Sequence, residues 1–162
     1  MENLDRKTPD IIVVKIPNFR AVTSRGNEWS ELMSWGWHEN HKHFFDDIIF
    51  NCNHFLVRRI VDGERRGEFV MAIKDFVTEA DVTPFEIIDF EGGLYAMSVS
   101  IDGDMDSVSR VEEKIFRWIE HTNFEADESR SIMGHMNFNN DEIKAGLGYE
   151  QLLRFVPIKL SA

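Results

Sequence analysis

Alternating apolar and polar side chains predict short β-strands along the chain. The clearest alternation is in residues 94–101, where four apolar side chains, including Tyr95 and Met97, would share one strand face and two serines the other. The β-branched run Ile11–Ile16 stops at a proline and is typical of a buried strand. Further strands are predicted at Phe19–Thr23, Phe55–Val61, Phe69–Phe76, Phe85–Phe90, Ser131–Phe138 and Gln151–Leu160.

Apolar residues spaced three or four positions apart predict helices between these strands. One helix would be capped by Asp106 or Ser107 and carries Trp118 within its apolar stripe. Another spans Glu28–Trp35, where Trp29 is expected to join the core, and a glycine breaks it at its end. The chain therefore combines helices and strands.

The order strand, helix, strand, strand occurs twice, in residues 10–78 and 84–162 approximately. Arg20–Val22 matches Tyr95–Met97 in position, and both halves end near an Ile-Lys pair. We therefore expect one α+β domain over residues 1–162, built of two pseudo-symmetric strand-helix-strand-strand units that form a central cleft. Because each unit has one helix for a small sheet, the other sheet face would pack on the twin unit or line that cleft.

Charge and composition narrow the classes of partner. Acidic residues outnumber basic ones by 29 to 18, a formal net charge of −11, which repels phosphate backbones and anionic lipids. We therefore expect no direct nucleic-acid partner and no membrane contact. Cys52 is the only cysteine, and neither a signal segment nor a spanning segment is visible, so we expect a cytoplasmic protein. No phosphate loop or dinucleotide fingerprint occurs, and no cofactor is expected.

Three segments and their order resemble the GyrI-like small-molecule-binding domain. They are FEIIDFEGGLYAMSVSIDG (Phe85–Gly103), TNFEAD (Thr122–Asp127) and RFVPIKL (Arg154–Leu160), with the helix that contains Trp118 between the first two. That domain is also the effector-binding part of AraC-type and MerR-type bacterial transcription regulators. The resemblance implies a pseudo-twofold fold whose aromatic cleft binds hydrophobic, planar and often cationic compounds, as in multidrug sensors. Because the first strand begins near Ile11, we expect a stand-alone form.

One position departs from the family pattern. The resemblance implies a glutamate four residues before the proline of the last strand, where it meets the ligand's positive charge or assists hydrolysis. Here that residue is Leu153. Glu150 is nearby, but its offset of three positions places it on the opposite face of an ideal strand. The departure weakens the expectation of a cationic ligand and of hydrolysis.

Aromatic residues are the main candidates for contact with a ligand. Because a glycine separates Trp35 from Trp37, one of the two would leave the helix stripe and line the cleft. Tyr95 and Phe155 would be further walls, whereas Trp118 fits both the core and the cleft. The expected ligand-binding set is Trp35, Trp37, Tyr95, Met97, Trp118, Glu150 and Phe155.

The histidines of the same region do not predict a metal site. On a helix only His38 and His41 would share a face, His43 would point elsewhere, and the spacing differs from the zinc-binding HExxH pattern. We read them as a solvated helix face, and no metal is expected.

Three functions remain open. The first is a binding protein, a drug or effector sensor or a sequestering protein, whose aromatic cleft captures a hydrophobic molecule. The second is a hydrolase of cyclopropane-bearing genotoxic compounds, with Glu150 or Glu68 positioning water, although no catalytic residue is assigned. The third is a protein-interaction role, with a regulator or gyrase as the partner. We expect a binding protein rather than an enzyme.

Overall fold

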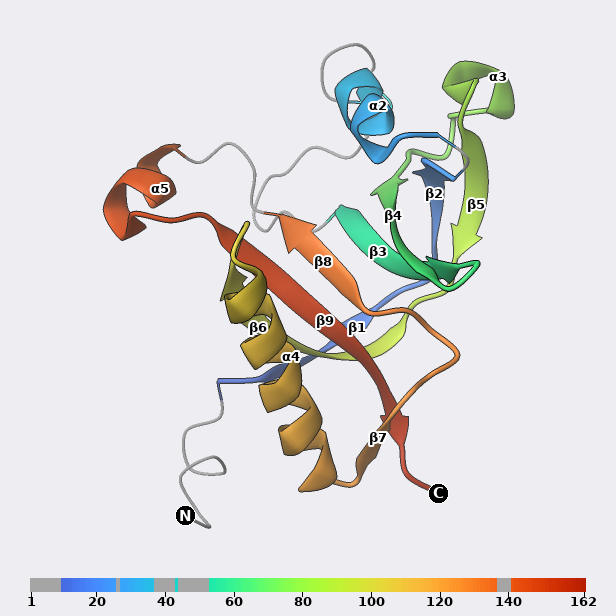
Figure 1. Ribbon diagram of the computed structural model, residues 1–162. Helices are drawn as coiled ribbons and strands as arrows, with labels where there is room; N and C mark the ends of the chain where they lie inside the picture. The colour runs from blue at the N-terminus through green and yellow to red at the C-terminus, as the bar shows by residue number, and fades with distance from the viewer. Residues whose placement is uncertain (1–9, 26, 37–42, 44–52, 137–140) are drawn as a thin grey trace. The chain divides into compact units, whose positions relative to one another are not determined.

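The computed structural model describes residues 10–25, 27–36, 43, 53–136 and 141–162. Their contacts divide the chain into two compact units. The first unit is Pro17–Gly92, and the second is Gly93–Ala162 together with the N-terminal segment that ends at Ile16. The ribbon in Figure 1 shows the elements of each unit.

The first unit is a four-stranded antiparallel sheet in the order β5-β2-β4-β3. Its β3 and β4 form a hairpin whose tight turn is Asp62-Gly63, both with positive φ, as the sequence pattern Asp-Gly favours. The elements are β2 (Phe19–Thr23), α2 (Trp29–Ser34), β3 (His54–Val61), β4 (Glu64–Ala72), α3 (Glu79–Val82) and β5 (Glu86–Phe90).

The second unit has the strand order β1-β6-β9-β8, also antiparallel, and a short β7 pairs with the C-terminal end of β9. The longest helix, α4, lies against this sheet (Figure 1). The elements are β1 (Ile12–Ile16), β6 (Gly93–Ile101), α4 (Met105–Glu120), β7 (Phe124–Ala126), β8 (Met133–Met136), α5 (Asp141–Leu147) and β9 (Gln151–Leu160).

The two units repeat the same order of elements, strand, helix, strand, strand. In the first unit these are β2, α2, β3 and β4, and in the second β6, α4, β8 and β9. Each sheet is completed by a strand from elsewhere in the sequence: β5 pairs with β2, and β1, at the start of the chain, pairs with β6. The predicted α+β class and doubled order are confirmed, whereas the boundaries of the repeats stay a prediction.

The helix α4 packs on one face of the second sheet through its apolar stripe. Ile115 and Ile119 are buried against Ala96, Val156 and Ile158 of the strands beneath. The helix is capped by Asp104, whose Oδ1 accepts a hydrogen bond from the backbone N–H of residue 107 at 2.9 Å. The predicted cap at Asp106 or Ser107 therefore lies two or three residues after the observed one. The turn at residues 102–103 ends just before Asp104, so the helix begins earlier than predicted.

The alternation in β6 is present, but its polar side is the one that faces α4. Ser98 and Ser100 are buried, and their hydroxyls donate to the backbone oxygens of Asp10 and Leu152. Serine side chains are small, and a hydroxyl that donates to a backbone oxygen can be buried beneath a helix at little cost in free energy. Tyr95, Met97 and Val99 thus lie on the face turned away from α4, which we call the far face of the second unit.

The strand β1 is not buried as its apolar sequence predicts. Ile12 is 56% exposed and Val13 38% exposed, and only Ile11, just before the strand, joins the core. Among the described residues β1 pairs with β6 alone, so it lies at an edge of its unit's sheet. A short β-branched run cannot distinguish an edge strand from a central one, because both need the same backbone conformation.

The first unit is built in the same way, with α2 against one face. Leu32 is fully buried, while the Trp29 ring lies 6.3 Å from that of Phe69 and remains 36% exposed. The prediction that Trp29 is a core residue is therefore wrong, because Leu32 occupies the inward position. The opposite face, the far face of the first unit, carries Phe19, Ala21, Thr23, Phe55, Val57, Arg59, Glu68, Val70, Ile88 and Phe90.

Residues matched between the two halves of the sequence lie on opposite faces of their sheets. Ala21 and Thr23 lie on a far face, as do Met97 and Val99, so these residues correspond in pairs. The sequence match instead aligned Ala21 with Ala96, which faces α4. Because side chains alternate along a strand, an error of one position exchanges the two faces.

Arg130 ties the segment after β7 to the sheet of the second unit. Its Nη2 donates to the backbone oxygens of Leu94 at 3.0 Å and Ile158 at 2.9 Å. The guanidinium occupies the place of a side chain at Gly93, where a Cβ atom would lie 2.3 Å from Nη1. Gly93 also has a φ of +141°, which L-residues rarely adopt.

Gly93→Ala is therefore expected to destabilise the protein by about 2 kcal/mol or more, because it adds backbone strain and displaces Arg130. The control is Gly103→Ala, where φ is +79° but nothing lies within 4 Å of the added Cβ. Urea unfolding should show a clearly smaller loss for the control. Equal losses would mean that the strained backbone alone matters and that Arg130 adjusts freely.

Candidate functional site

The far face of the second unit is an apolar floor with an exposed margin. Tyr95, Met97 and Phe155 are buried, and Met133 joins them through its register with Phe155. Toward the β9 N-terminus the same face reaches solvent, where Val99 is 43% exposed. An exposed apolar margin beside buried aromatic rings is a surface on which a hydrophobic molecule can displace water.

The ring of Tyr95 contacts an aromatic ring and a guanidinium on this floor. It meets the ring of Phe155 edge-on at 6.2 Å, with an interplanar angle of 87°. The guanidinium carbon of Arg130 lies 4.7 Å from the Tyr95 ring centroid, a cation–π contact. The cation that lies over the Tyr95 ring is therefore the guanidinium of Arg130.

Asp127 holds Arg130 in this position. Its Oδ2 accepts a hydrogen bond from Arg130 Nε at 2.8 Å, and its Oδ1 accepts one from the Ser129 hydroxyl at 2.6 Å. The hydrogen bonds from Ser129 and Arg130 lower the pKa of Asp127 to about 2. The carboxylate is charged at every ordinary pH, which keeps the guanidinium over the Tyr95 ring.

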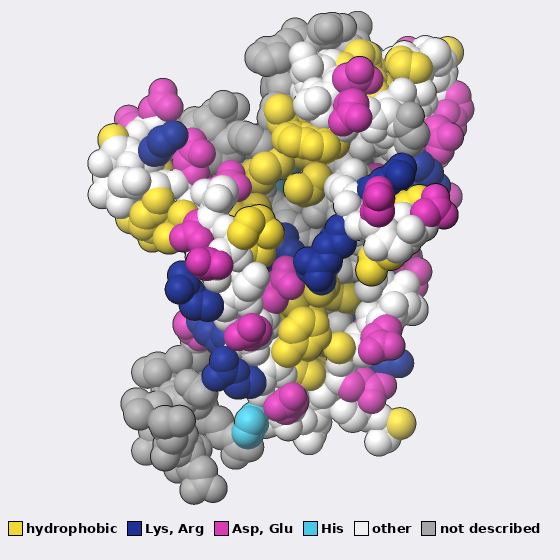
Figure 2. Space-filling model, in the orientation of Figure 1, with side chains coloured by type: hydrophobic (Ala, Val, Ile, Leu, Met, Phe, Trp, Pro, Cys, Tyr) yellow, Lys and Arg dark blue, Asp and Glu magenta, His cyan; other side chains and the backbone are white. Residues whose placement is uncertain are grey.

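Three residues of the expected ligand-binding set share one face, and Trp118 lies on the other face of the same sheet. Tyr95, Met97 and Phe155 lie together on the far face of the second unit. Trp118 lies on α4, on the other side of the sheet, and stacks on Phe124 at 6.3 Å. Figure 2 shows the hydrophobic side chains that gather between α4 and β7.

The remaining members of the set lie elsewhere or outside the described residues. Trp35 belongs to the first unit, follows α2 and packs at 5.5 Å from the ring of Phe85. Trp37 lies outside the described residues. Glu150 is exposed just before β9 and pairs with Lys144 at 3.2 Å. The assignment of all seven residues to a ligand stays a prediction.

Three phenylalanines form an aromatic cluster on the far face of the first unit, which the sequence analysis missed. Phe19 stacks on Phe90 at 4.6 Å, and Phe55 lies 6.2 Å from Phe19 and 6.1 Å from Phe90. The cluster depends on the pairing of β5 with β2, which brings residues 19 and 90 into register. No local pattern reveals such pairing.

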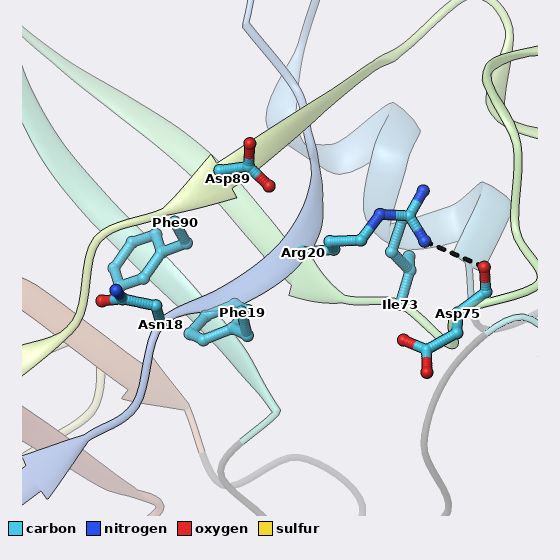
Figure 3. A pocket seen from close by; sticks show the side chains of 7 residues that line it. All are labelled: Asn18, Phe19, Arg20, Ile73, Asp75, Asp89 and Phe90. Atoms are coloured by element: carbon cyan, nitrogen blue, oxygen red, sulfur yellow. Dashed lines mark hydrogen bonds between the residues drawn. The ribbon is translucent and has the colours of Figure 1, made fainter.

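The phenylalanine cluster reaches the surface in an open hollow of about 520 Å³. Figure 3 shows Phe19 and Phe90 beside Asn18 at one end, and Arg20 with Asp75 at the other. Arg20 donates to the backbone oxygens of residues 74, 75 and 77, so its guanidinium is fixed. The wall is completed by Ile73 and Asp89.

Glu68 is a buried carboxylate on the same far face. Only 4% of the residue is exposed, and Oε1 accepts a hydrogen bond from the hydroxyl of Thr23. Oε1 lies 3.4 Å from Arg25 Nη2, and Oε2 forms an ion pair with Arg59 Nε. Although Oε2 accepts no regular hydrogen bond, this ion pair at contact distance compensates its charge. Both oxygens are therefore engaged by the chain.

Metal-binding groups and membrane spans were also sought. In the described parts of the chain no group of three or more His, Cys, Asp or Glu side chains could hold a metal ion. His43 is buried there, whereas His38 and His41 lie outside the described residues. No described helix is long and apolar enough to cross a membrane.

Comparison with known proteins shows a shared fold. No protein-family model matches the sequence, and no curated protein matches it significantly. The structure of SAV2435 bound to tetraphenylphosphonium has a TM-score of 0.57 and 10% identity, over 92% of this chain and 93% of that one. The EcmrR C-terminal domain gives 0.56 and 14%, over 93% and 97%. A hydrolase from Listeria innocua gives 0.61 and 12%, over 93% and 92%.

These similarities establish the fold of the chain. The predicted GyrI-like fold is confirmed, because the likeness extends over nearly the whole length of each chain. The doubled strand-helix-strand-strand order of the two units belongs to this fold.

The low pKa of Asp127 makes a pH dependence testable. Because the folded-state pKa of about 2 lies below the usual 3.8, the group stabilises the fold above pH 4 approximately, and this contribution is lost as pH falls toward 2. Asp127→Asn should remove about 1 kcal/mol at pH 7. Urea unfolding of both proteins at several pH values checks this. The difference should shrink toward pH 2, and a constant difference would contradict the assignment.

Proposed function

We propose that the chain binds a hydrophobic small molecule with aromatic rings on the far face of its second unit. The observation that carries the proposal is the exposed apolar margin at Val99, continuous with the buried floor of Tyr95, Met97 and Phe155. The fold supports it, because SAV2435 with this fold is bound to tetraphenylphosphonium. A sensor or sequestering role would use the same site.

Affinity comes mainly from apolar burial. A molecule that covers Val99 and reaches the ring edges removes apolar surface from water at about 25 cal/mol per Å². The floor is already fixed by Arg130 and by the Tyr95–Phe155 contact, so little side-chain ordering opposes binding. A preformed apolar face of this kind tolerates several ligands of similar shape.

Val99→Gln should weaken binding of the neutral fluorescent probe N-phenyl-1-naphthylamine about tenfold, since burying a valine side chain contributes about 1.5 kcal/mol. Val13→Gln is the matched control. Val13 is similarly exposed, at 38% against 43%, but it faces the α4 side, opposite Ala96. The affinity of the Val13→Gln variant for the probe should equal that of the wild type. The absence of saturable binding by the wild type would refute the proposed function.

Hydrolysis is the second candidate function, because hydrolases from Listeria innocua share the fold. A catalytic carboxylate must reach the substrate or its attacking water. Glu150 is exposed and paired with Lys144, and both oxygens of Glu68 are engaged by Thr23 and two arginines. The geometry therefore favours binding over turnover.

A cyclopropane-bearing compound is incubated with the protein in molar excess over it. We expect one equivalent to bind and all of the compound to be recovered unchanged, as measured by chromatography. Glu68→Gln is the comparison that assigns any activity. Multiple turnovers by the wild type that disappear in this variant would establish the hydrolase in place of a simple binding protein.

A further inference from the structure

The connection between β8 and β9 is longer than its counterpart in the first unit. There the tight turn at residues 62–63 joins β3 to β4, whereas residues 137–150 lie between β8 and β9. The described part of this connection is α5 and residues 148–150. In Figure 1 α5 lies beyond the start of β9. The additional residues therefore stand at the end of β9 where the far face of the second unit reaches solvent.

α5 is not packed into its unit as α4 is. None of its seven residues is buried, whereas α4 buries Ile115 and Ile119. Ile143 and Leu147 are four positions apart and so lie on one side of the helix, and Leu147 is 46% exposed. Tyr149, just beyond the helix, is 37% exposed. This segment thus carries apolar surface that a movement toward the strands would bury.

The junction between α5 and β9 can change its backbone conformation. Gly148 has a φ of +81°, and nothing lies within 4 Å of a Cβ atom added there. Its N–H donates to the backbone oxygen of Lys144 at 2.8 Å, which ends the helix. On the strand side, the N–H of Asp102 donates to the backbone oxygen of Glu150 at 2.8 Å. The strand is therefore fixed as far as Glu150, and the adjustable positions are Gly148 and Tyr149.

α5 is held at the surface by a weak ion pair. Lys144 Nζ lies 3.2 Å from Glu150 Oε1, but these side chains are 58% and 50% exposed. Exposed ion pairs contribute little to stability and are screened by salt. A seven-residue helix with Gly146 inside it is also only marginally stable by itself. Moving α5 therefore costs little free energy compared with the apolar contacts that a bound molecule can offer.

The far-face margin is the surface that α5 would cover by folding back along β9. On the other side of the sheet α4 covers this end of the strands, and its Ser107 hydroxyl accepts a hydrogen bond from the N–H of Ile101 at 3.0 Å. On the far face Val99 is 43% exposed and lies opposite Leu153, the third residue of β9. Seven helical residues span about 10 Å, the length of about three strand residues. α5 is therefore long enough to reach Val99.

We propose that α5 is a strap that closes over a molecule bound at Val99, with Leu147 and Tyr149 as the outer wall of the site. Closure covers the molecule on the side that the far face leaves open to water. The molecule can then leave only when the strap reopens, so closure lengthens its residence time. This inference rests on the proposed function and adds two contact residues to it.

Fluorine NMR observes the floor and the strap separately. The chain has two tyrosines, Tyr95 on the floor and Tyr149 on the strap, so fluorotyrosine labelling gives one signal for each, and Tyr149→Phe assigns them. In the free protein a soluble gadolinium chelate should broaden the signal of exposed Tyr149 and not that of buried Tyr95. Saturation with N-phenyl-1-naphthylamine should shift the Tyr149 signal and remove most of this broadening. In Val99→Gln the same change should need about tenfold more probe.

The two tyrosines make the possible failures distinguishable. A shift at Tyr95 while Tyr149 stays unshifted and equally broadened would overturn the inference and leave the proposed function standing. Binding of the probe that changes neither signal would overturn both. Without saturable binding of the probe the proposed function fails, and the inference fails with it.

A substitution tests the effect of the strap on residence time. Tyr149→Ser should raise the dissociation rate of the probe about fivefold and weaken its binding by a similar factor, as stopped-flow fluorescence measures. Phe116→Ser is the matched control, because Phe116 is 39% exposed on α4, against 37% for Tyr149, and both rates should stay as in the wild type. Equal effects of the two substitutions, or a wild-type dissociation rate in Tyr149→Ser, would contradict the inference.

Discussion

In the described residues a helix packs on one face of the sheet in each unit, and that constraint determines which side chains of the strands share a face. In the second unit α4 uses Ile115 and Ile119 to bury Ala96, Val156 and Ile158. All apolar residues of opposite parity must then lie on the other face of the same strands. That is why Tyr95, Met97 and Phe155 form one surface, although they come from strands far apart in the sequence.

Charged residues border the apolar surface in each unit. Arg130 lies over the Tyr95 ring and is held there by its ion pair with Asp127. Leu153 lies opposite Val99 on the far face of the second unit. In the first unit Glu68 is enclosed by Thr23, Arg25 and Arg59. The chain thus shares a fold with a protein bound to tetraphenylphosphonium, while the far face of its own first unit carries both arginines and carboxylates.

Local patterns predicted the elements whose conformation depends on their own residues. The strand β9 matches its predicted bounds, and β6 differs from the prediction by one residue. The short β7 and α5 were missed, because three and seven residues carry too little periodicity. The division of β6 into an apolar face and a serine face was predicted correctly. Nothing in the sequence of the strand itself shows that the serine face lies beneath α4.

The features that define the candidate site depend on pairing between distant segments. The pairing of β5 with β2 brings Phe19 next to Phe90, and no local sequence signal predicts it. Arg130 reaches Tyr95 from a turn 35 residues away in the sequence, where it looks like an ordinary surface arginine. Tyr95 and Phe155 could be proposed because strand parity and the family resemblance both pointed to them.

Methionine methyl groups report on the two faces of the second sheet separately. Met97 and Met133 lie on the far face, whereas Met136 is in register with Leu152 on the α4 side and Met105 is exposed at the start of α4. In a titration with N-phenyl-1-naphthylamine followed by methyl NMR, we expect shifts at Met97 and Met133 and none at Met105 or Met136. Shifts confined to Met105 and Met136 would contradict this prediction.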